Sequence, residues 1–490
     1  MTKLNVNRNL YTKCSVGMIA FTLLSSNAAE FPAMKASSPL SFEHTIRAAQ
    51  KNDPWITGNV HKQRAIESMS DAVNTLPDPK MSIGLANLPT NGFDFGQEGM
   101  TQVKVGISQM FPRGDTLAIK SQQLKSQSEA YPYQRKDRGS KVAVTVGTLW
   151  LDAYKIQQSI VLIEKNRSLF EQLADVATAS YSSALGKTRQ QDIVRAQLEL
   201  THLEDRLDKL AQQKNHYDGI LLQWLTLFPI DDSSVVETSF ETDFSFNNFS
   251  LENIVLSQQL PQIDLLNPNL VYKKNGLKAD ELVRYFSNHP AILAVEKKIN
   301  SMKTGIKLAK QKYQPEWGVN ASYGYRSDDP MGRSRADLFS VGVTFDLPLF
   351  TENRQDKEVQ SAISKTEAVK TEKLLLLREL LGSYLSAKGR LLRLKDRQNL
   401  YQEKLLPQIH DQAEASLTAY TNDDGDFSEV VRSRIAVLNA EIDELALNVD
   451  EQKIRLELNY LFVGSINNAT TQNNMYITNS SQYASISGEK

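Results

Sequence analysis

The sequence predicts a mainly α-helical protein with a pair of β-hairpins, in which one structural unit occurs twice. Three observations lead to this fold class. Short strings recur in order in the second half, apolar residues keep a heptad spacing over long stretches, and four segments alternate between apolar and small polar residues. The composition agrees, because 23 glycines and 16 prolines in 490 residues are few for an all-β protein.

The first element is a predicted signal peptide at residues 1–28. Three basic residues precede a short apolar run at 14–24, and Ser26-Asn27-Ala28 places small residues at a cleavage site. The alternative, an N-terminal anchor helix, is disfavoured because the run is too short to span about 30 Å of hydrocarbon. The only cysteine, Cys14, lies within this segment, so the mature chain is expected to have no disulfide and no lipidated thiol.

Two repeats follow, at 42–229 and 279–463. Their landmarks recur in the same order and at one common interval. The pairs are Asn52-Asp53-Pro54 with Asn288-His289-Pro290, Pro79 with Pro315, Val105-Gly106-Ile107-Ser108 with Val341-Gly342-Val343-Thr344, and Pro112 with Pro348. The polar residues 230–278 are expected to connect the repeats, and 464–490 is expected to form a polar C-terminal tail.

Each repeat contains a predicted β-hairpin, with strands near 80–88 and 101–111 in the first and near 316–326 and 337–347 in the second. The alternation, and a length near that of a tilted membrane strand, fit strands between lipid and a water-filled lumen. The alternative is two amphipathic hairpins that cover a soluble core. Because four strands cannot close a channel, membrane strands would require several chains to share one barrel.

Long helices complete each repeat. Residues 116–185 are predicted to be essentially helical, with Pro132 and Gly139 indicating a kink near the start. Apolar or small residues recur at alternating spacings of three and four over 142–184, and again over 431–449. This spacing is that of a left-handed coiled-coil seam. Each repeat is therefore expected to hold a helical hairpin, and the molecule to form a tube or rod.

Several strings resemble the TolC-type outer-membrane efflux family, and the resemblance covers roughly 42–463. They are LPDPKMSIGLANLP at 76–89, VGISQMFPRG at 105–114, VGVTFDLPLFTENRQ at 341–355, and the hairpin-turn strings around Gly186 and Gly425. The first two resemble the first hairpin of members attached to heavy-metal efflux systems. The third resembles the exit of the family's second strand pair.

The resemblance implies a homotrimer in the outer membrane of a Gram-negative bacterium. Three copies of four strands would form a 12-stranded β-barrel, continued by a long coiled-coil α-helical barrel in the periplasm. The implied partners are a periplasmic adaptor (membrane fusion) protein, an inner-membrane resistance-nodulation-division-type transporter and outer-membrane lipid. The implied function is the exit duct of a tripartite efflux system, which passively conducts substrates, heavy-metal cations in this branch.

Two other functions remain open: a duct for drugs or secreted protein and, in a different class, a soluble periplasmic coiled-coil scaffold. No nucleophile constellation, phosphate-binding glycine loop or helical histidine pair stands out in the sequence. We therefore expect no enzyme activity, no cofactor and no bound metal. A net charge of −1 disfavours nucleic acid as a partner.

The acidic residues Asp423, Asp424 and Asp426 at the second hairpin turn are a candidate periplasmic gate. Under threefold symmetry a carboxylate that points to the axis becomes a ring, which attracts cations and repels anions. The alternative is an acidic turn that caps a helix N-terminus. By the family pattern, the second hairpin lines the pore and the first lies against the adaptor.

Two further sets of residues complete the candidates. The adaptor contacts expected at the first hairpin turn are Leu185, Gly186, Lys187 and Thr188, although Gly186 can equally serve only the backbone of the turn. The residues expected to face lipid are Trp317, Tyr323, Tyr325 and Phe339.

Overall fold

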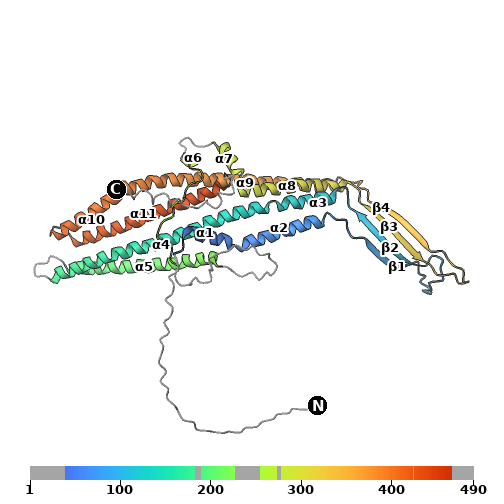
Figure 1. The fold of residues 1–490 in the computed structure, drawn as a ribbon, viewed down its shortest axis with the longest axis horizontal. Helices are drawn as coiled ribbons and strands as arrows, with labels where there is room; N and C mark the ends of the chain where they lie inside the picture. Colours follow the sequence, from blue (N-terminus) through green and yellow to red (C-terminus); the bar gives the residue numbers. More distant parts are fainter. Residues whose placement is uncertain (1–38, 183–188, 227–253, 273–277, 423, 466–490) are drawn as a thin grey trace, which may run out of the picture. The chain divides into compact units, whose positions relative to one another are not determined.

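Figure 1 shows a computed structural model of the protein. The structure describes residues 39–182, 189–226, 254–272, 278–422 and 424–465. All of them belong to one compact unit, Pro39–Lys490. The expected signal peptide, the first hairpin turn and most of the C-terminal tail lie outside the described residues, as does much of the connector. The described chain is mainly helical with a four-stranded sheet, which confirms the predicted fold class.

The first repeat begins with two helices, continues with a strand pair, and ends with a long helix and its return. Its elements are α1 (Phe42–Lys51), α2 (Pro54–Ala72), β1 (Lys80–Ala86), β2 (Gln102–Phe111), α3 (Thr116–Ser128), α4 (Tyr131–Ser182) and α5 (Gln190–Leu225).

The second repeat has the same order, preceded by a short helix that lies in the expected connector. The elements are α6 (Pro268–Tyr272), α7 (Ala279–Phe286), α8 (Pro290–Lys310), β3 (Trp317–Tyr325), β4 (Leu338–Phe345), α9 (Gln355–Leu400), a π-helical turn (Tyr401–Leu405), α10 (Leu406–Thr421) and α11 (Phe427–Leu461). Single 3-10 turns follow α8 and α11.

The recurring strings before Pro54 and Pro290 cap equivalent helices. Asp53 accepts a hydrogen bond from the backbone N–H of Trp55 at 3.1 Å, and His289 accepts one from Ala291 at 3.2 Å. Proline fits the first helical position in both cases, because no intrahelical partner is available for an N–H there. The two repeats therefore start their second helix with the same backbone geometry and different capping groups.

The helix expected over 116–185 is interrupted near its start. α3 ends at Ser128, and α4 begins at Tyr131 with Pro132 in its first turn, where the missing N–H costs nothing. From there α4 continues for 52 residues, which corresponds to about 78 Å at ~1.5 Å per residue. The kink predicted from Pro132 is thus a break between two helices, and Gly139 lies within the uninterrupted second one.

Three apolar clusters among the described residues hold the helices together. The largest joins α1, α4 and α5 around Trp150, which is fully buried, stacks on Tyr154 and meets Phe42 edge to face. A second joins α7, α9 and α11. The third joins the two helical hairpins, with Phe170, Ala196 and Val431 in its interior. The seam residues of both repeats therefore pack against one another.

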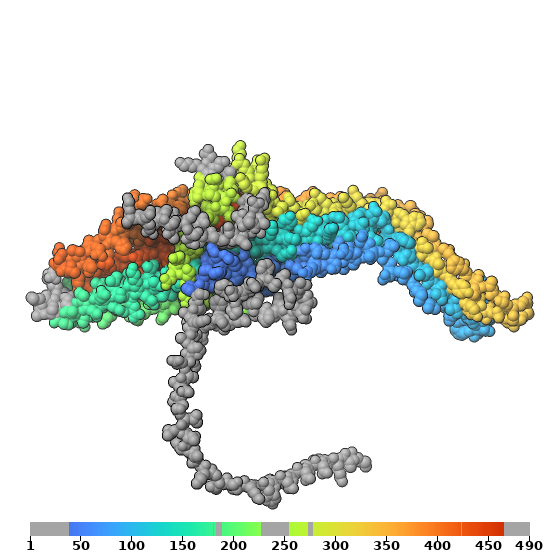
Figure 2. Space-filling view, in the orientation of Figure 1, coloured from blue at the N-terminus to red at the C-terminus, as the bar shows by residue number. Residues whose placement is uncertain are grey.

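The residues of α6 and α7 lie on the surface of the helices, as Figure 2 shows. They attach through buried side chains: the ring of Phe286 lies 6.4 Å from that of Tyr384 in α9, and the Tyr384 hydroxyl donates to the backbone oxygen of Leu270 at 2.7 Å. None of the described helices is apolar over a length sufficient to cross a bilayer.

Candidate functional site

The four strands form an antiparallel sheet in the order β1-β2-β3-β4. Residues directly opposite one another share a face of the sheet. Tyr323 lies between Val105 and Phe339, and Ala321 lies between Ile107 and Val341. The register therefore gathers most of the apolar residues of the four strands onto one continuous face.

That apolar face is exposed in the single chain. The four predicted lipid-facing residues all lie on it, with relative exposures of 45% for Trp317, 49% for Tyr323, 55% for Tyr325 and 71% for Phe339. Aliphatic residues of β1 and β4, such as Ile83 at 69% and Val341 at 64%, extend it to both edges of the sheet. An exposed apolar surface of this extent marks a site of contact with lipid or with another protein.

The opposite face is mostly polar or glycine. Its polar and glycine members are Lys80, Ser82, Gly84, Gln102, Lys104, Gly106, Ser108, Gly318, Asn320, Ser322, Gly324, Ser340, Gly342 and Thr344, and Ala86, Met110 and Leu338 lie on the same face near its ends. The sheet thus has one face suited to an apolar environment and one suited to water, with a register that keeps the two apart.

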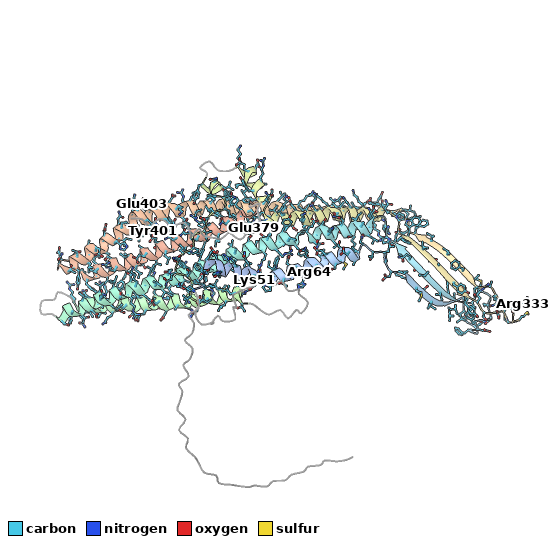
Figure 3. All side chains as sticks on the ribbon, viewed as in Figure 1. Lys51, Arg64, Arg333, Glu379, Tyr401 and Glu403 are labelled. Atoms are coloured by element: carbon cyan, nitrogen blue, oxygen red, sulfur yellow. The ribbon has the colours of Figure 1, made fainter. Side chains whose placement is uncertain are left out.

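Arg113 joins the sheet to the helices at one end. Its guanidinium donates to the backbone oxygens of Lys312 at 3.2 Å and Gln314 at 3.1 Å, and it forms an ion pair with Asp346. Asp346 in turn accepts from the backbone N–H of Glu316 at 2.7 Å. The first repeat therefore supplies the side chain that ties both strands of the second hairpin to α8. Arg333 marks the opposite end of the sheet in Figure 3, in the loop between β3 and β4.

The acidic turn of the second helical hairpin, between α10 and α11, contains a residue with a defined structural role. Asp426 caps α11 by accepting from the backbone N–H of Ser428 at 3.1 Å. Hydrogen bonds from the backbone and side chain of Ser428, together with Arg189 and Arg195, hold the pKa of Asp426 below its usual range. Asp426 therefore fulfils the capping alternative and stays ionised.

The other predicted residues at the hairpin turns are less constrained. Asp424 is exposed, and a Cβ on the adjacent Gly425 would lie 2.6 Å from the backbone nitrogen of Tyr420, so the turn requires glycine there. Asp423, and the predicted adaptor contacts at 185–188, lie outside the described residues. The structure therefore brings Asp424 and Asp426 to one turn and leaves the rest of both sets as predictions.

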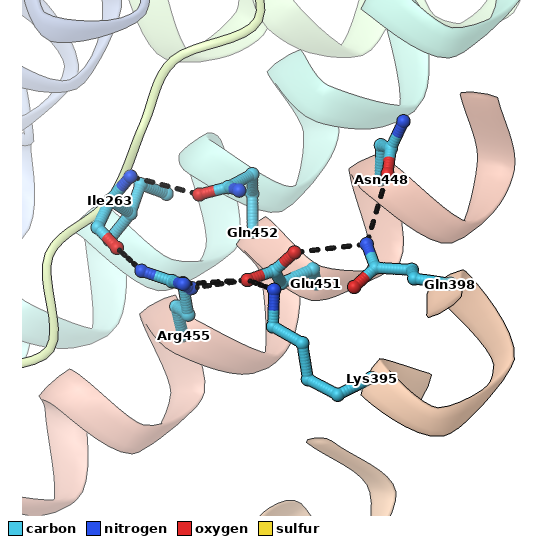
Figure 4. Close-up of polar contacts among 7 residues, drawn as sticks. All are labelled: Ile263, Lys395, Gln398, Asn448, Glu451, Gln452 and Arg455. Carbon is cyan, nitrogen blue, oxygen red and sulfur yellow. Dashed lines mark hydrogen bonds and ion pairs between the residues drawn. The ribbon is translucent and has the colours of Figure 1, made fainter. Parts of the chain in front are cut away.

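A polar cluster that the sequence analysis missed joins α9, α11 and the chain segment before α6 (Figure 4). Glu451 forms ion pairs with Lys395 at 2.7 Å and Arg455 at 2.6 Å, and accepts from Gln398 at 2.9 Å. Burial opposes ionisation, but the hydrogen bonds from Lys395 and Gln398 and the charge of Arg455 hold the pKa of Glu451 low. Arg455 also donates to the backbone oxygen of Ile263 at 2.8 Å.

His289 is a second buried polar residue that the sequence analysis used only as a landmark. Its Nδ1 accepts the capping bond from Ala291, and its Nε2 lies 3.1 Å from the backbone oxygen of Tyr460. The Tyr460 hydroxyl donates to Asp137 of α4 at 2.9 Å. Burial lowers the pKa of His289, against the opposing charge of Asp137. The ring is therefore neutral at pH 7, with its proton on Nε2.

Among the described residues, no three histidine, cysteine, aspartate or glutamate side chains are grouped so that they could hold a metal ion. A cavity of about 870 Å³ is an open depression lined by residues of α6 and α7, including Tyr272, Glu281 and Arg284. The two-faced sheet and the turn of the second helical hairpin are therefore the features of the described chain from which we argue its function.

No protein-family model and no curated protein sequence matches this chain. Its fold is similar to solved structures. CusC shares 14% identity with a TM-score of 0.65, over 86% of this chain and 91% of that one. The CmeC outer membrane channel of Campylobacter jejuni shares 13% identity with a TM-score of 0.66, over 88% of each chain.

The open state of the MtrE outer membrane channel of Neisseria gonorrhoeae shares 12% identity with a TM-score of 0.62, over 86% of this chain and 88% of that one. At these identities the likeness establishes the fold. That fold is the one expected from the resemblance to TolC-type channels, so the resemblance is confirmed at the level of architecture.

Proposed function

We propose that this protein is the outer-membrane exit duct of a tripartite efflux system, acting as a trimer with a periplasmic extension. The observation that carries the proposal is the two-faced sheet. Its apolar face is exposed and its opposite face is mostly small and polar, which is the division expected between lipid and a water-filled lumen. The shared fold with outer membrane channels supports the same conclusion.

The edges of the sheet support the trimer. β1 and β4 each pair with one neighbour within the described chain, so each leaves a row of backbone donors and acceptors open. In a bilayer such groups must be satisfied, and a closed barrel satisfies them. Three copies joined edge to edge would supply 12 strands, enough to enclose a lumen.

The proposed partners are a periplasmic adaptor protein and an inner-membrane transporter of the resistance-nodulation-division type. The hairpin turns, including the predicted contacts at 185–188, would meet them. In this role the chain conducts passively and performs no chemistry on its cargo. Heavy-metal cations are the cargo that the acidic turn supports, because Asp424 is exposed and Asp426 is ionised. Comparing the sensitivity of a deletion strain to zinc, copper, silver and drugs tests that choice.

A pair of arginine substitutions on adjacent residues of β4 tests the membrane role. Val341 lies on the apolar face and Ser340 on the polar face. An arginine facing the bilayer midplane costs about 2–4 kcal/mol, whereas one facing a lumen stays hydrated. We expect Val341→Arg to reduce the heat-modifiable trimer in the outer-membrane fraction and Ser340→Arg to preserve it.

The reverse result, or equal effects of the two variants, would contradict the proposed orientation of the sheet. Recovery of the unaltered mature protein as a soluble periplasmic species would instead favour the coiled-coil scaffold. D424N and D426N variants test the gate, because asparagine retains the capping group and removes the charge. Unaltered conductance and ion preference in both would exclude these carboxylates as the gate.

A further inference from the structure

The four strands carry two charged side chains between them, and both are lysines on the polar face. Lys80 begins β1 and Lys104 lies in β2, while β3 and β4 contain no charged residue. The register places both lysines on the face that also carries Ser108 and Asn320. Neither lysine forms an ion pair within the described part of the chain, and both are exposed. The charge of this face is therefore positive and not neutralised by its own strands.

The neighbours of Lys104 leave its side chain uncovered. It lies directly between Gly84 of β1 and Gly324 of β3. Glycine has no side chain to pack against the lysine stem or to accept from its ammonium group. Lys80 lies opposite Ser108, about 13 Å from Lys104 along the sheet at ~3.3 Å per residue.

Over the rest of the polar face, polar side chains occupy the space above glycines, so they project little from the sheet. A Cβ on Gly324 would overlap Oε1 of Gln102, and one on Gly342 would lie 2.8 Å from Oδ1 of Asn320. These side chains therefore lie along the sheet. The two ammonium groups are then the charges that a solute moving over this face would meet.

The carboxylates at the two ends of β4 are already engaged. Asp337 accepts from the hydroxyl of Tyr323 and from the backbone N–H of Arg326, and Asp346 is paired with Arg113. Both carboxylates are bonded to groups at the ends of the sheet, so they do not neutralise Lys80 and Lys104.

We propose that Lys80 and Lys104 make the polar face an anion-attracting wall, and that the solutes exported over it are anionic. The inference rests on the proposed function of an exit duct and, at the sheet end of that duct, replaces the bare metal cation proposed above as cargo by an anionic solute. Three copies would place six ammonium groups around one lumen, and a ring of fixed positive charge favours anions over cations. A metal would then cross this end of the duct as an anionic complex, because a bare divalent cation is repelled.

The test is the ion selectivity of the purified full-length mature protein in planar lipid bilayers under a potassium chloride gradient. The K80Q/K104Q variant is expected to lower the chloride-to-potassium permeability ratio roughly two- to fivefold at ~10 mM salt, where the Debye length is about 30 Å. The shift is expected to vanish near 1 M salt, where that length is about 3 Å. The matched control is K80R/K104R, which retains both charges and is expected to keep the unaltered ratio.

The outcomes separate the two proposals. A conducting protein whose ratio is the same in K80Q/K104Q overturns the anion wall and leaves the exit duct standing. A shift of equal size in K80R/K104R also overturns it, because charge would not be the cause. If the unaltered protein forms no pore under any condition, the proposed function itself fails.

Discussion

His289 shows how one side chain can make a helix start depend on pH. Its Nδ1 must be unprotonated to accept from Ala291, and the equivalent residue of the first repeat is the acid Asp53. Burial lowers the pKa of His289. Two charged residues of α4 act on it in opposite directions: Asp137 raises the pKa and Lys141 lowers it. The stability that the neutral ring contributes as a helix cap is therefore fully present above the ordinary pKa of about 6.5. It is lost as pH falls through the lower pKa that His289 has in the folded protein.

Replacing His289 by asparagine is expected to weaken this pH dependence. Asparagine can cap the helix through its side-chain oxygen and does not titrate. We expect the loss of thermal stability between pH 7.5 and pH 5 to be smaller in H289N than in the unaltered protein. Thermal melting of the helical circular dichroism signal at both pH values measures this. An identical loss in the two proteins would show that another group carries the pH dependence.

Glu451 is expected to stabilise the fold more than an exposed acid in a similar ion pair. The E451Q substitution leaves Lys395 and Arg455 close together without a counter-charge. Because Lys395 is 38% exposed, we expect a loss of about 2 kcal/mol, below the ~3–5 kcal/mol of a fully buried pair. Chemical unfolding in detergent measures the difference.

The control for this prediction is E457Q. Glu457 lies on α11, as Glu451 does, and is a partly exposed partner of Arg390 in α9. A surface pair of this kind contributes at most about 1 kcal/mol. Equal losses in E451Q and E457Q would contradict the stabilising role of the buried cluster.

At the scale of elements, the π-helical turn between α9 and α10 has a local cause. Figure 3 places Tyr401 and Glu403 in this turn, and the N–H of Leu406 donates to the oxygen of Tyr401, five residues earlier. Pro407 follows and has no N–H to continue the regular ladder. The turn adds one residue to a helical revolution at the point where the ladder is broken.

The P407A substitution is expected to return this turn to the regular α-helical pattern. Alanine supplies the missing N–H, so amide hydrogen exchange over 402–406 is expected to become slower. P54A is the matched control, since Pro54 starts α2, where no N–H partner is needed. Unchanged exchange in P407A would show that packing, not the proline, causes the π-helical turn.

Periodic patterns predicted these elements well, because such patterns are local. Alternation at period two places Tyr323 and Phe339 on one face whatever the partner strand, and the register agrees. The break between α3 and α4 was foreseen only as a kink near Pro132. Its position at Glu129 and Ala130 precedes the proline, because proline is accommodated in the first turn of the new helix.

At the scale of the whole molecule, the features that the sequence could not predict are those made by distant residues. Lys395 and Glu451 come from different helices, and the backbone of Ile263 reaches Arg455 from far along the chain. None of these residues has a local signature beyond a charge on a helix. The sequence could not predict the unneutralised charge of Lys104 either, because it depends on Gly84 and Gly324, which the strand register places on either side of it.

The central claim is that three chains close one barrel through their open strand edges, and cysteine cross-linking tests it most directly. In the mature chain, a cysteine at Ser82 of β1 is combined with cysteines scanned along the polar face of β4, from Ser340 to Thr344. The sole natural cysteine is Cys14, within the expected signal peptide. β2 and β3 separate β1 from β4 within one chain by about 14 Å, so no intrachain disulfide can form.

We predict that at least one pairing gives covalent products that end at three chains in the outer-membrane fraction. A protein that stays monomeric at every position scanned, or forms ladders that continue beyond three, would contradict a closed trimer.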